Sequence, residues 1–383
     1  MIKIANVIED GRLAGPQLRM LNVAQSLRKH GIATTLLIPV DKSEAFSKLI
    51  SDKGINFRKL KVVCLQKRIL SFLRYVVSFL FDIFRICHSI KELSPDLIHV
   101  SGGAWQFKSV IAAKLSGGKV IWHLNDTSMP MIIRLVFGLV SHMCTDAFIV
   151  AGEKVRNTYL SRANNKKIIH TIGAPVDTKR FSSIHTSYAD KLQKLSDKFK
   201  IITVANINPN KGIDLIIEIA GLLRNEVKFQ FVIVGPIYKS QEQYYKRLLG
   251  LIQKKKLKNV YFTGPFEHIP ATLKSCDIYL CCSMFEASPT SVWEAMAMEL
   301  PVISTRVGDL PLILEESKSG YLVDADPKQI SERIYSLYKD KQLAREMGRR
   351  GRDVVKKMFD IESVTEKHKA IYTKVLTDKN IYR

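Results

Sequence analysis

Residues 278–304 read Ile278-Tyr-Leu-Cys-Cys282-Ser-Met-Phe-Glu286-Ala-Ser288-Pro289-Thr290-Ser291-Val-Trp-Glu294-Ala-Met-Ala-Met-Glu-Leu-Pro-Val-Ile-Ser304. An apolar run is followed by a short polar loop, an alanine-rich helical pattern and a second apolar run. Ser288 is a good N-cap and Pro289 a good first helical residue, so a helix is predicted from there to about Glu299. Strand, helix and strand in this order are typical of a parallel sheet covered by helices.

The same alternation runs along the chain in both directions. It predicts strands at Ile2–Ile8, Thr34–Ile38, Leu97–Val100, Val120–His123, Ala147–Val150, Ile201–Ala205, Phe231–Val234, Val260–Phe262, Ile278–Cys282 and Val302–Ser304. The polar, lysine-rich stretch 182–200 separates the two groups of strands. We therefore expect an α/β protein with two Rossmann-like, doubly wound domains facing across a cleft. The expected domains are 1–182 and 183–364, with a C-terminal helix at about 365–383 packing back on the first.

The predicted helix after Ser288 offers a site for an anion. Its start leaves free N–H groups near Pro289, Thr290 and Ser291 at the positive end of the helix dipole. Carboxylates next to a phosphate would repel it, so Glu286 and Glu294 are interpreted as acceptors for sugar hydroxyls. The alternative is a capped core helix with a solvated glutamate.

A second polar segment, Asn206-Ile-Asn-Pro-Asn-Lys211-Gly212, follows the strand predicted at Ile201–Ala205. Lys211 stands where a helix begins, and a cation there is unfavourable unless an anion lies nearby. The alternative is a surface lysine in a turn.

Two residues of the first half follow strands in the same way. Gly15 lies between the first strand and the first helix, where it permits close approach of a phosphate or sugar. His123 ends a buried strand at its carboxyl edge, where ligands of doubly wound sheets bind. The alternatives are a glycine turn without a ligand and a satisfied core histidine.

Several function classes are excluded by missing motifs. The sequence has no G-x-G-x-x-G, no P-loop and no G-x-S-x-G elbow. The six cysteines show no zinc-ligand spacing, so neither a metal nor a cofactor is expected, and a reducing compartment is favoured. With neither a secretory signal nor a membrane-spanning run, we expect a cytoplasmic protein.

The charge is +23 overall, and residues 1–180 hold 27 basic and 12 acidic residues, a net charge of +15. Aromatic and basic residues alternate over Lys67–Arg85, which predicts peripheral attachment to an anionic membrane surface, the inner face of the cytoplasmic membrane. The alternative is a helix that is simply buried on its sheet. Nucleic-acid binding is not expected, because no suitable basic region appears.

Together these segments resemble the family-four retaining glycosyltransferases, which have the GT-B fold. The spacing from Glu286 to Glu294 matches the family's E-x7-E motif. The segments with further resemblance are Asn208-Pro-Asn-Lys211-Gly212, Gly173-Ala-Pro-Val-Asp177-Thr-Lys-Arg-Phe181 and Thr305-Arg-Val-Gly308-Asp309-Leu-Pro311.

The resemblance implies a role for each candidate residue. Glu294 would bind the ribose of a nucleotide-sugar donor and Glu286 the hydroxyls of the donor sugar. Lys211 would neutralise the diphosphate, with amides near Ser288–Ser291 assisting. Gly15 would approach the donor, and His123 would lie at the reacting sugar, near its 6-hydroxyl. The donor would be a nucleotide-diphosphate sugar, and the acceptor a lipid-linked or growing cell-envelope glycan.

The sequence departs from the family pattern at three positions. Asn206 stands in place of an arginine that normally helps Lys211 hold the phosphates, and Arg19 or Arg306 could replace it. Ala287 and Asp309 stand in place of glycines. Two alternative functions therefore remain open, a catalytically weak or inactive scaffold with this fold and a nucleotide-sugar 2-epimerase.

Overall fold

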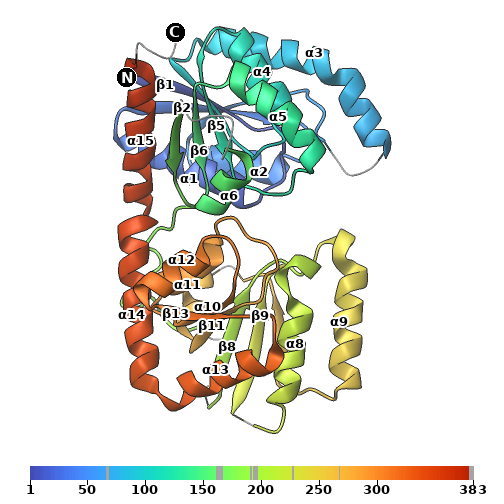
Figure 1. Cartoon of the computed structure of the whole chain (residues 1–383), viewed down its shortest axis with the longest axis vertical. Coiled ribbons are helices and arrows are strands. Elements are labelled where there is room, and N and C mark those ends of the chain that lie inside the picture. The colour runs from blue at the N-terminus through green and yellow to red at the C-terminus, as the bar shows by residue number, and fades with distance from the viewer. Residues whose placement is uncertain are drawn as a thin grey trace. The chain divides into compact units, whose positions relative to one another are not determined.

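The computed structural model describes residues 1–65, 69–160, 167–189, 192, 197–226, 228–266 and 268–378, with the side chains of 69–72 excepted. The chain forms two compact units (Figure 1). Unit 1 contains Met1–Pro175 and Ile361–Arg383, and unit 2 contains Val176–Asp360. The first division falls at Pro175, whereas the sequence analysis placed it after Ser182.

The strands of unit 1 form one parallel sheet in the order β3-β2-β1-β4-β5-β6-β7. The strands are β1 (Ile2–Val7), β2 (Ile32–Pro39), β3 (Asn56–Leu60), β4 (Leu97–Val100), β5 (Lys119–Leu124), β6 (Ala147–Val150) and β7 (Ile168–Thr171). This is the doubly wound order, in which the chain turns back after β3 and continues on the other side of β1.

The helices of unit 1 are α1 (Gly15–Lys29), α2 (Glu44–Asp52), α3 (Ile69–Leu93), α4 (Phe107–Leu115), α5 (Met131–Cys144), α6 (Glu153–Tyr159) and α15 (Ile361–Thr377). Helix α15 comes from the far end of the chain and packs against α1. Its residues Ile371 and Val375 are fully buried in one apolar cluster with Ile4 of β1 and Ile149 of β6. The last helix therefore completes the core of the first unit.

Unit 2 repeats the same plan in the order β10-β9-β8-β11-β12-β13, all parallel. The strands are β8 (Phe199–Val204), β9 (Phe229–Val234), β10 (Val260–Gly264), β11 (Ile278–Cys281), β12 (Val302–Thr305) and β13 (Gly320–Val323). The α-helices are α8 (Ile213–Leu222), α9 (Glu242–Lys254), α10 (Ile269–Lys274), α11 (Thr290–Ala297), α12 (Leu310–Ser317), α13 (Pro327–Lys339) and α14 (Lys341–Met358). The 3₁₀ turns are η1 (Pro209–Lys211) and η2 (Lys239–Gln241). The expected pair of doubly wound sheets is confirmed.

A buried ion pair fixes which side of α3 faces the sheet. Lys108 of α4 is fully buried, and its Nζ lies 2.9 Å from Oδ2 of Asp82 on α3 and 3.9 Å from Oε2 of Glu9. The Tyr75 ring lies 4.0 Å from the same ammonium group. One side of α3 is thereby held inward, and the opposite side faces solvent.

Replacing Lys108 with alanine is expected to destabilise unit 1 by about 3–5 kcal/mol, because it leaves two buried carboxylates without their cation. Urea unfolding monitored by circular dichroism measures the change. The double variant Lys108→Met/Asp82→Leu should recover part of the loss, since it removes the ammonium group together with the nearer of the two carboxylates and leaves only Glu9 without its cation. A single variant as stable as the wild type would contradict this role.

Candidate active site

Two loops of unit 2 meet where the strand order reverses. Strands β8 and β11 are neighbours in the sheet, and a ligand site is expected at the carboxyl ends of such a pair. The loop after β8 carries Lys211, and the loop after β11 carries Glu286. The Lys211 Nζ lies 2.5 Å from Oε1 of Glu286, and the Ser283 hydroxyl donates to the same oxygen at 2.9 Å. The structure thus brings together two residues that are 75 positions apart.

Glycine is required directly beside this ion pair. Gly212 has a φ of 62°, and a Cβ there would lie 2.0 Å from the carbonyl oxygen of Cys282. The Met284 N–H donates to the Asn210 carbonyl at 2.8 Å, which joins the two loops. A larger residue at 212 would push the loops apart, so this glycine keeps Lys211 within reach of Glu286.

The helix after Glu286 begins later than the sequence predicts. Helix α11 starts at Thr290 with Pro289 as its N-cap, and no side chain caps it. The prediction that Ser288 is the N-cap is therefore wrong. The Ser288 hydroxyl instead accepts a hydrogen bond from Nε1 of Trp293 at 3.1 Å, so it is not available for the helix end.

The start of α11 still presents N–H groups without helical partners, at Thr290 and Ser291. The Tyr279 hydroxyl fixes the position of this turn. It lies 2.8 Å from the Ser291 hydroxyl and 3.3 Å from the carbonyl oxygen of Val204, the last residue of β8. A helix of eight residues is thus held at the end of β8, where an anion can be met by N–H groups.

Glu294 lies in the second turn of α11 and is partly buried. Burial raises the pKa of its carboxyl to about 7, and the charge of Arg180 opposes that rise. The sequence analysis included Arg180 in a segment of family resemblance but gave it no role. A carboxyl with a pKa near 7 exists in both protonation states under ordinary conditions, so its ability to accept two hydroxyl hydrogen bonds depends on pH.

Asn206, which stands where the family pattern has an arginine, takes part in a local turn. Asn206 accepts a hydrogen bond from Nδ2 of Asn208 at 2.9 Å through its own Oδ1. Arg306, one suggested replacement, is exposed and lies 3.2 Å from Glu315 and 3.7 Å from Asp324. Arg306 is therefore already engaged with two carboxylates.

The other suggested replacement, Arg19, lies inside unit 1. Its Nη1 is 2.5 Å from Nε2 of His123, and Nδ1 of His123 is 3.2 Å from Nε2 of His99. Nδ1 of His99 is in turn 2.7 Å from the Tyr372 hydroxyl on α15. Because a guanidinium nitrogen only donates, a neutral His123 must carry its proton on Nδ1, and His99 must do the same. The orientation of both rings is fixed by this chain.

The electrostatics of this cluster keep the histidines neutral. Burial lowers the pKa of His99, His123 and His368, in the last case to about 4, and the Arg19 charge lowers them further. Burial also lowers the pKa of Arg19 to about 10, so it stays charged at neutral pH. Both ring nitrogens of His123 are engaged and its side chain is fully buried, so its contact with a sugar stays a prediction.

Gly15 is the first residue of α1 and is exposed. A Cβ at this position would meet no atom within 4 Å, so nothing inside unit 1 requires glycine there. Its proposed approach to a donor stays a prediction. The described residues contain no group of three or more His, Cys, Asp or Glu side chains that could hold a metal.

Comparison with known proteins identifies the family. Residues 185–354 match the family described as glycosyl transferases group 1, and residues 20–136 match the glycosyltransferase family 28 N-terminal domain. The matched region 185–354, which makes up most of unit 2, belongs to the glycosyl transferases group 1 family. Members of this family are retaining glycosyltransferases that use nucleotide-sugar donors, so the chain is an enzyme of that class.

Three similar proteins illustrate the range of the family. N-acetyl-alpha-D-glucosaminyl L-malate synthase of Bacillus anthracis is 25% identical over 70% of this chain and 68% of its own length. The phosphatidylinositol N-acetylglucosaminyltransferase GPI3 subunit of Saccharomyces cerevisiae is 26% identical over 62% of this chain, which spans half of that protein. The structure of Anabaena HepE in complex with UDP and glucose is 16% identical, covers 98% of this chain and 100% of its own, and has a TM-score of 0.83. This last likeness confirms the GT-B fold.

The affinity for UDP-glucose is expected to rise about tenfold between pH 6 and pH 8, because the Glu294 carboxylate accepts hydroxyls better than the protonated acid does. Calorimetry at fixed ionic strength measures this, and the donor diphosphate does not itself titrate in that range. Glu294→Gln should bind weakly with a flat pH profile. The same slope in wild type and variant would show that another group titrates.

Lys211→Ala is expected to reduce turnover about 100-fold, because it removes the cation at the departing diphosphate. The loss of sugar donor over time is measured with saturating acceptor. Lys246→Ala, which removes an exposed lysine from α9 of the same unit, serves as the control and should leave turnover unchanged. A decrease below fivefold in the Lys211 variant would mean that another group holds the phosphates.

Proposed function

We propose that this chain transfers a hexosyl or N-acetylhexosaminyl group from a UDP-sugar to a lipid-linked or growing cell-envelope glycan, with retention, at an anionic membrane surface. The observation that carries the proposal is the pairing of Lys211 with Glu286 beside the start of α11. A cation, helix N–H groups and a carboxylate at one sheet edge match a diphosphate joined to a sugar. The UDP in HepE and the N-acetylglucosaminyl names of two relatives support the choice of donor.

Each residue has a distinct task in this reaction. The bond between the anomeric carbon and the diphosphate breaks, and the diphosphate leaves with the electron pair. The oxygen of the acceptor hydroxyl bonds to that carbon on the same face, and its proton passes to the departing diphosphate oxygen. Lys211 and the N–H groups of Thr290 and Ser291 would stabilise the negative charge that develops on the leaving diphosphate. Glu286, released from Lys211 when phosphate takes its place, would accept hydroxyls of the sugar. Glu294 would hold the ribose.

The donor and the reaction type can be tested together. The full chain is incubated with UDP-glucose, UDP-N-acetylglucosamine or GDP-mannose and a polyprenyl-diphosphate-linked sugar acceptor. Proton NMR of the product should show the anomeric configuration of the donor. A 2-epimeric sugar with free UDP would favour the epimerase alternative. No turnover of any donor, with nucleotide binding intact, would favour the scaffold alternative.

The membrane part of the proposal rests on two helices of unit 1. Large apolar side chains point to solvent along α3 and α5, and each is at least half exposed. They are Leu73, Val76, Val77, Leu80, Phe81 and Phe84 on α3, and Met131, Ile132, Leu135, Val136, Leu139 and Met143 on α5. Exposed apolar surface on this scale marks an interaction site. The sequence analysis expected α3 to attach and did not include α5.

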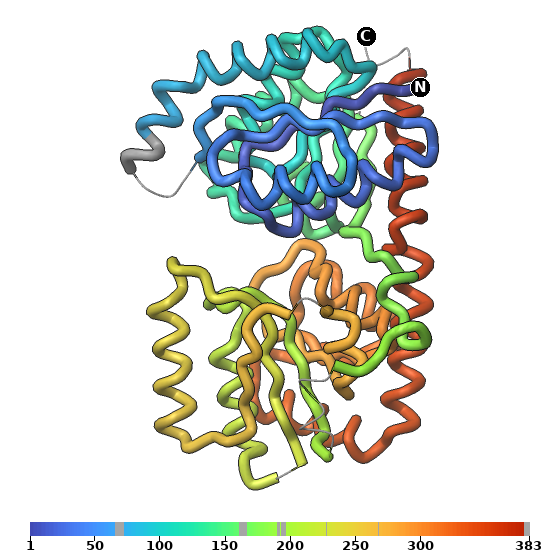
Figure 2. The backbone as a smooth tube through the Cα atoms, turned by 180° about the vertical axis from the view of Figure 1, so that it is seen from behind, coloured from blue at the N-terminus to red at the C-terminus, as the bar shows by residue number. Residues whose placement is uncertain are grey.

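The two helices belong to one side of the unit. Helix α4 packs against both α3 and α5, and Figure 2 shows α3, in light blue, running along the outside of unit 1. Asp82 is turned inward to Lys108, and α5 contains no acidic residue. Exposed Arg74 and Arg85 on α3 supply the positive charge that anionic lipid attracts. Lys67 and Arg68 of the predicted segment lie outside the described residues.

No helix among the described residues is long and apolar enough to cross a membrane. Attachment is therefore proposed to be peripheral, with the apolar sides of α3 and α5 placed at the level of the lipid headgroups.

Leu135→Glu/Leu139→Glu is expected to abolish sedimentation with anionic vesicles of phosphatidylglycerol and phosphatidylethanolamine, because it places two charges on the exposed side of α5. Leu249→Glu/Leu312→Glu is the matched control, since these leucines are exposed in unit 2, and it should sediment like the wild type. Wild-type protein that stays in the supernatant at low salt would overturn the proposal. So would a wild-type dimer that the first variant dissociates, because a second copy would then cover this surface.

A further inference from the structure

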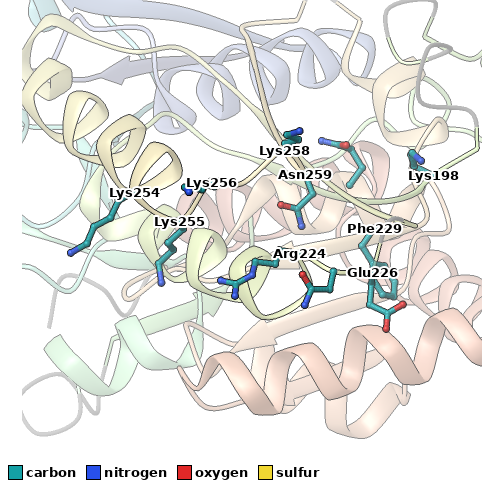
Figure 3. Close-up of a pocket in the computed structure, with 11 residues that line it drawn as sticks. Lys198, Arg224, Glu226, Phe229, Lys254, Lys255, Lys256, Lys258 and Asn259 are labelled. Atoms are coloured by element: carbon teal, nitrogen blue, oxygen red, sulfur yellow. The ribbon is translucent and has the colours of Figure 1, made fainter.

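A second polar pocket lies at the opposite end of the unit 2 sheet from Lys211 and Glu286. Its volume is about 780 Å³, and it is lined by residues that precede or begin β8, β9 and β10 (Figure 3). The candidate active site lies after the carboxyl ends of β8 and β11. Since β8 has six residues, which span roughly 17–20 Å, the two sites are distinct. The volume is in the range of small-molecule sites.

Positive charge dominates the lining of this pocket. Its cations are Lys198, Arg224, Lys254, Lys255, Lys256 and Lys258, and its one carboxylate is Glu226. Lys198 pairs with Asp197 at 2.9 Å, and Lys255 pairs with Glu218 at 2.9 Å. Within the described part of the chain, the other four cations make no ion pair within 4 Å.

The ordinary explanation for such a cluster is that lysines neutralise the carboxyl ends of helices. Helices α8 and α9 both end here, at Leu222 and Lys254. Each end carries a partial charge of about −0.5, so two ends offset about one positive charge, and Glu226 offsets another. Of four unpaired cations, about two charges remain, which is the charge of one phosphate group.

The side-chain oxygen of a buried amide, Asn259, lacks a hydrogen-bond partner in the same pocket. Asn259 is 9% exposed, and its Nδ2 donates to the carbonyl of Ala220 at 2.9 Å. Its Oδ1 is buried and accepts no hydrogen bond from any described residue. Figure 3 shows Asn259 among the cations, and Asn225 and Gln230 add two further amides to the lining. A buried acceptor without a donor is costly, and a small turn of the side chain toward the pocket would let a ligand hydroxyl satisfy it.

We propose that this pocket binds a small phosphorylated sugar. The unpaired cations would hold the phosphate, and Asn259 with the neighbouring amides would accept and donate hydrogen bonds to the sugar hydroxyls. Apart from Phe229, every lining residue carries a charged or amide group, which favours a hydroxylated ligand over a lipid chain. This site does not depend on the proposed transferase reaction.

The test uses glucose 6-phosphate and inorganic phosphate as probes, with calorimetry on the full chain at pH 7.5 and low salt. Wild-type protein should bind glucose 6-phosphate more tightly than phosphate. Arg224→Gln/Lys258→Gln should weaken binding of both at least tenfold, because each lost charge-assisted hydrogen bond carries roughly that factor. Lys48→Gln/Lys374→Gln, which removes two exposed cations of unit 1, should bind like the wild type.

Further variants separate this pocket from the donor site. Lys211→Ala should leave binding of glucose 6-phosphate unchanged, since its cation belongs to the other end of the sheet. Asn259→Asp should reduce the preference for the sugar phosphate over inorganic phosphate, and circular dichroism checks its folding. No binding by the wild type at millimolar concentration would overturn the proposal. Binding that is lost in the Lys211 variant, or kept in Arg224→Gln/Lys258→Gln, would do the same.

Discussion

The parallel arrangement of β8 and β11 is the constraint on which the candidate active site depends. Parallel strands place all of their carboxyl ends at one edge of the sheet. Because the strand order reverses, β8 and β11 are neighbours in the sheet. From β8 the chain continues to β9 on one side, and from β11 it continues to β12 on the other side. Lys211 and Glu286 therefore meet although three α-helices (α8, α9 and α10) and three strands (β9, β10 and β11) separate them in sequence. The close fit at Gly212 then holds the two loops at a distance where ammonium and carboxylate touch.

The charges of Lys211 and Glu286 at this edge of the sheet are compatible with the binding of an anion. The side chain of Lys211 is only 25% exposed and that of Glu286 only 15%. Alone, Lys211 would be unfavourably placed at the start of a helix, and Glu286 would be unfavourably placed next to a phosphate. Their pairing satisfies both groups, and in the proposed reaction a diphosphate would compete for the lysine and sugar hydroxyls for the glutamate. Arg306, a further cation of unit 2 considered for the phosphates, is engaged with Glu315 and Asp324. If this edge binds the diphosphate as proposed, Lys211 supplies the larger share of the positive charge there.

The sequence predicted the interior strands of both sheets and one edge strand, β10, but missed the other three edge strands. Central strands such as Ile278–Cys281 are apolar throughout because both faces are covered. Strands β3, β7 and β13 lie at sheet edges, are only partly buried and were not predicted. Their sequences, such as Asn56-Phe-Arg-Lys-Leu60, mix polar and apolar residues in a way that loops share.

The same distinction holds for the site residues. Glu286, Glu294 and Lys211 could be proposed as site residues from the sequence, because each stands near a strand end or helix start that local patterns reveal. The contacts of His123 with Arg19, His99 and Tyr372 join α1, β4, β5 and α15, and no local pattern indicates such long-range partners. The helix start at Thr290 was misplaced because the Ser288 hydroxyl is used by Trp293, a contact that only the packed helix provides.

Helix α15 has a consequence for how the protein is made. It supplies Ile371, Tyr372 and Val375 to the core of unit 1, yet it is translated after all of unit 2. At about 5–20 residues per second, the ribosome needs tens of seconds between Pro175 and this helix. During that time the nascent first unit holds an open apolar face, while unit 2 is contiguous in sequence and can close by itself. The order of folding is therefore expected to be the reverse of the order of synthesis, with unit 2 complete first and the N-terminal half becoming native only once α15 has left the ribosome.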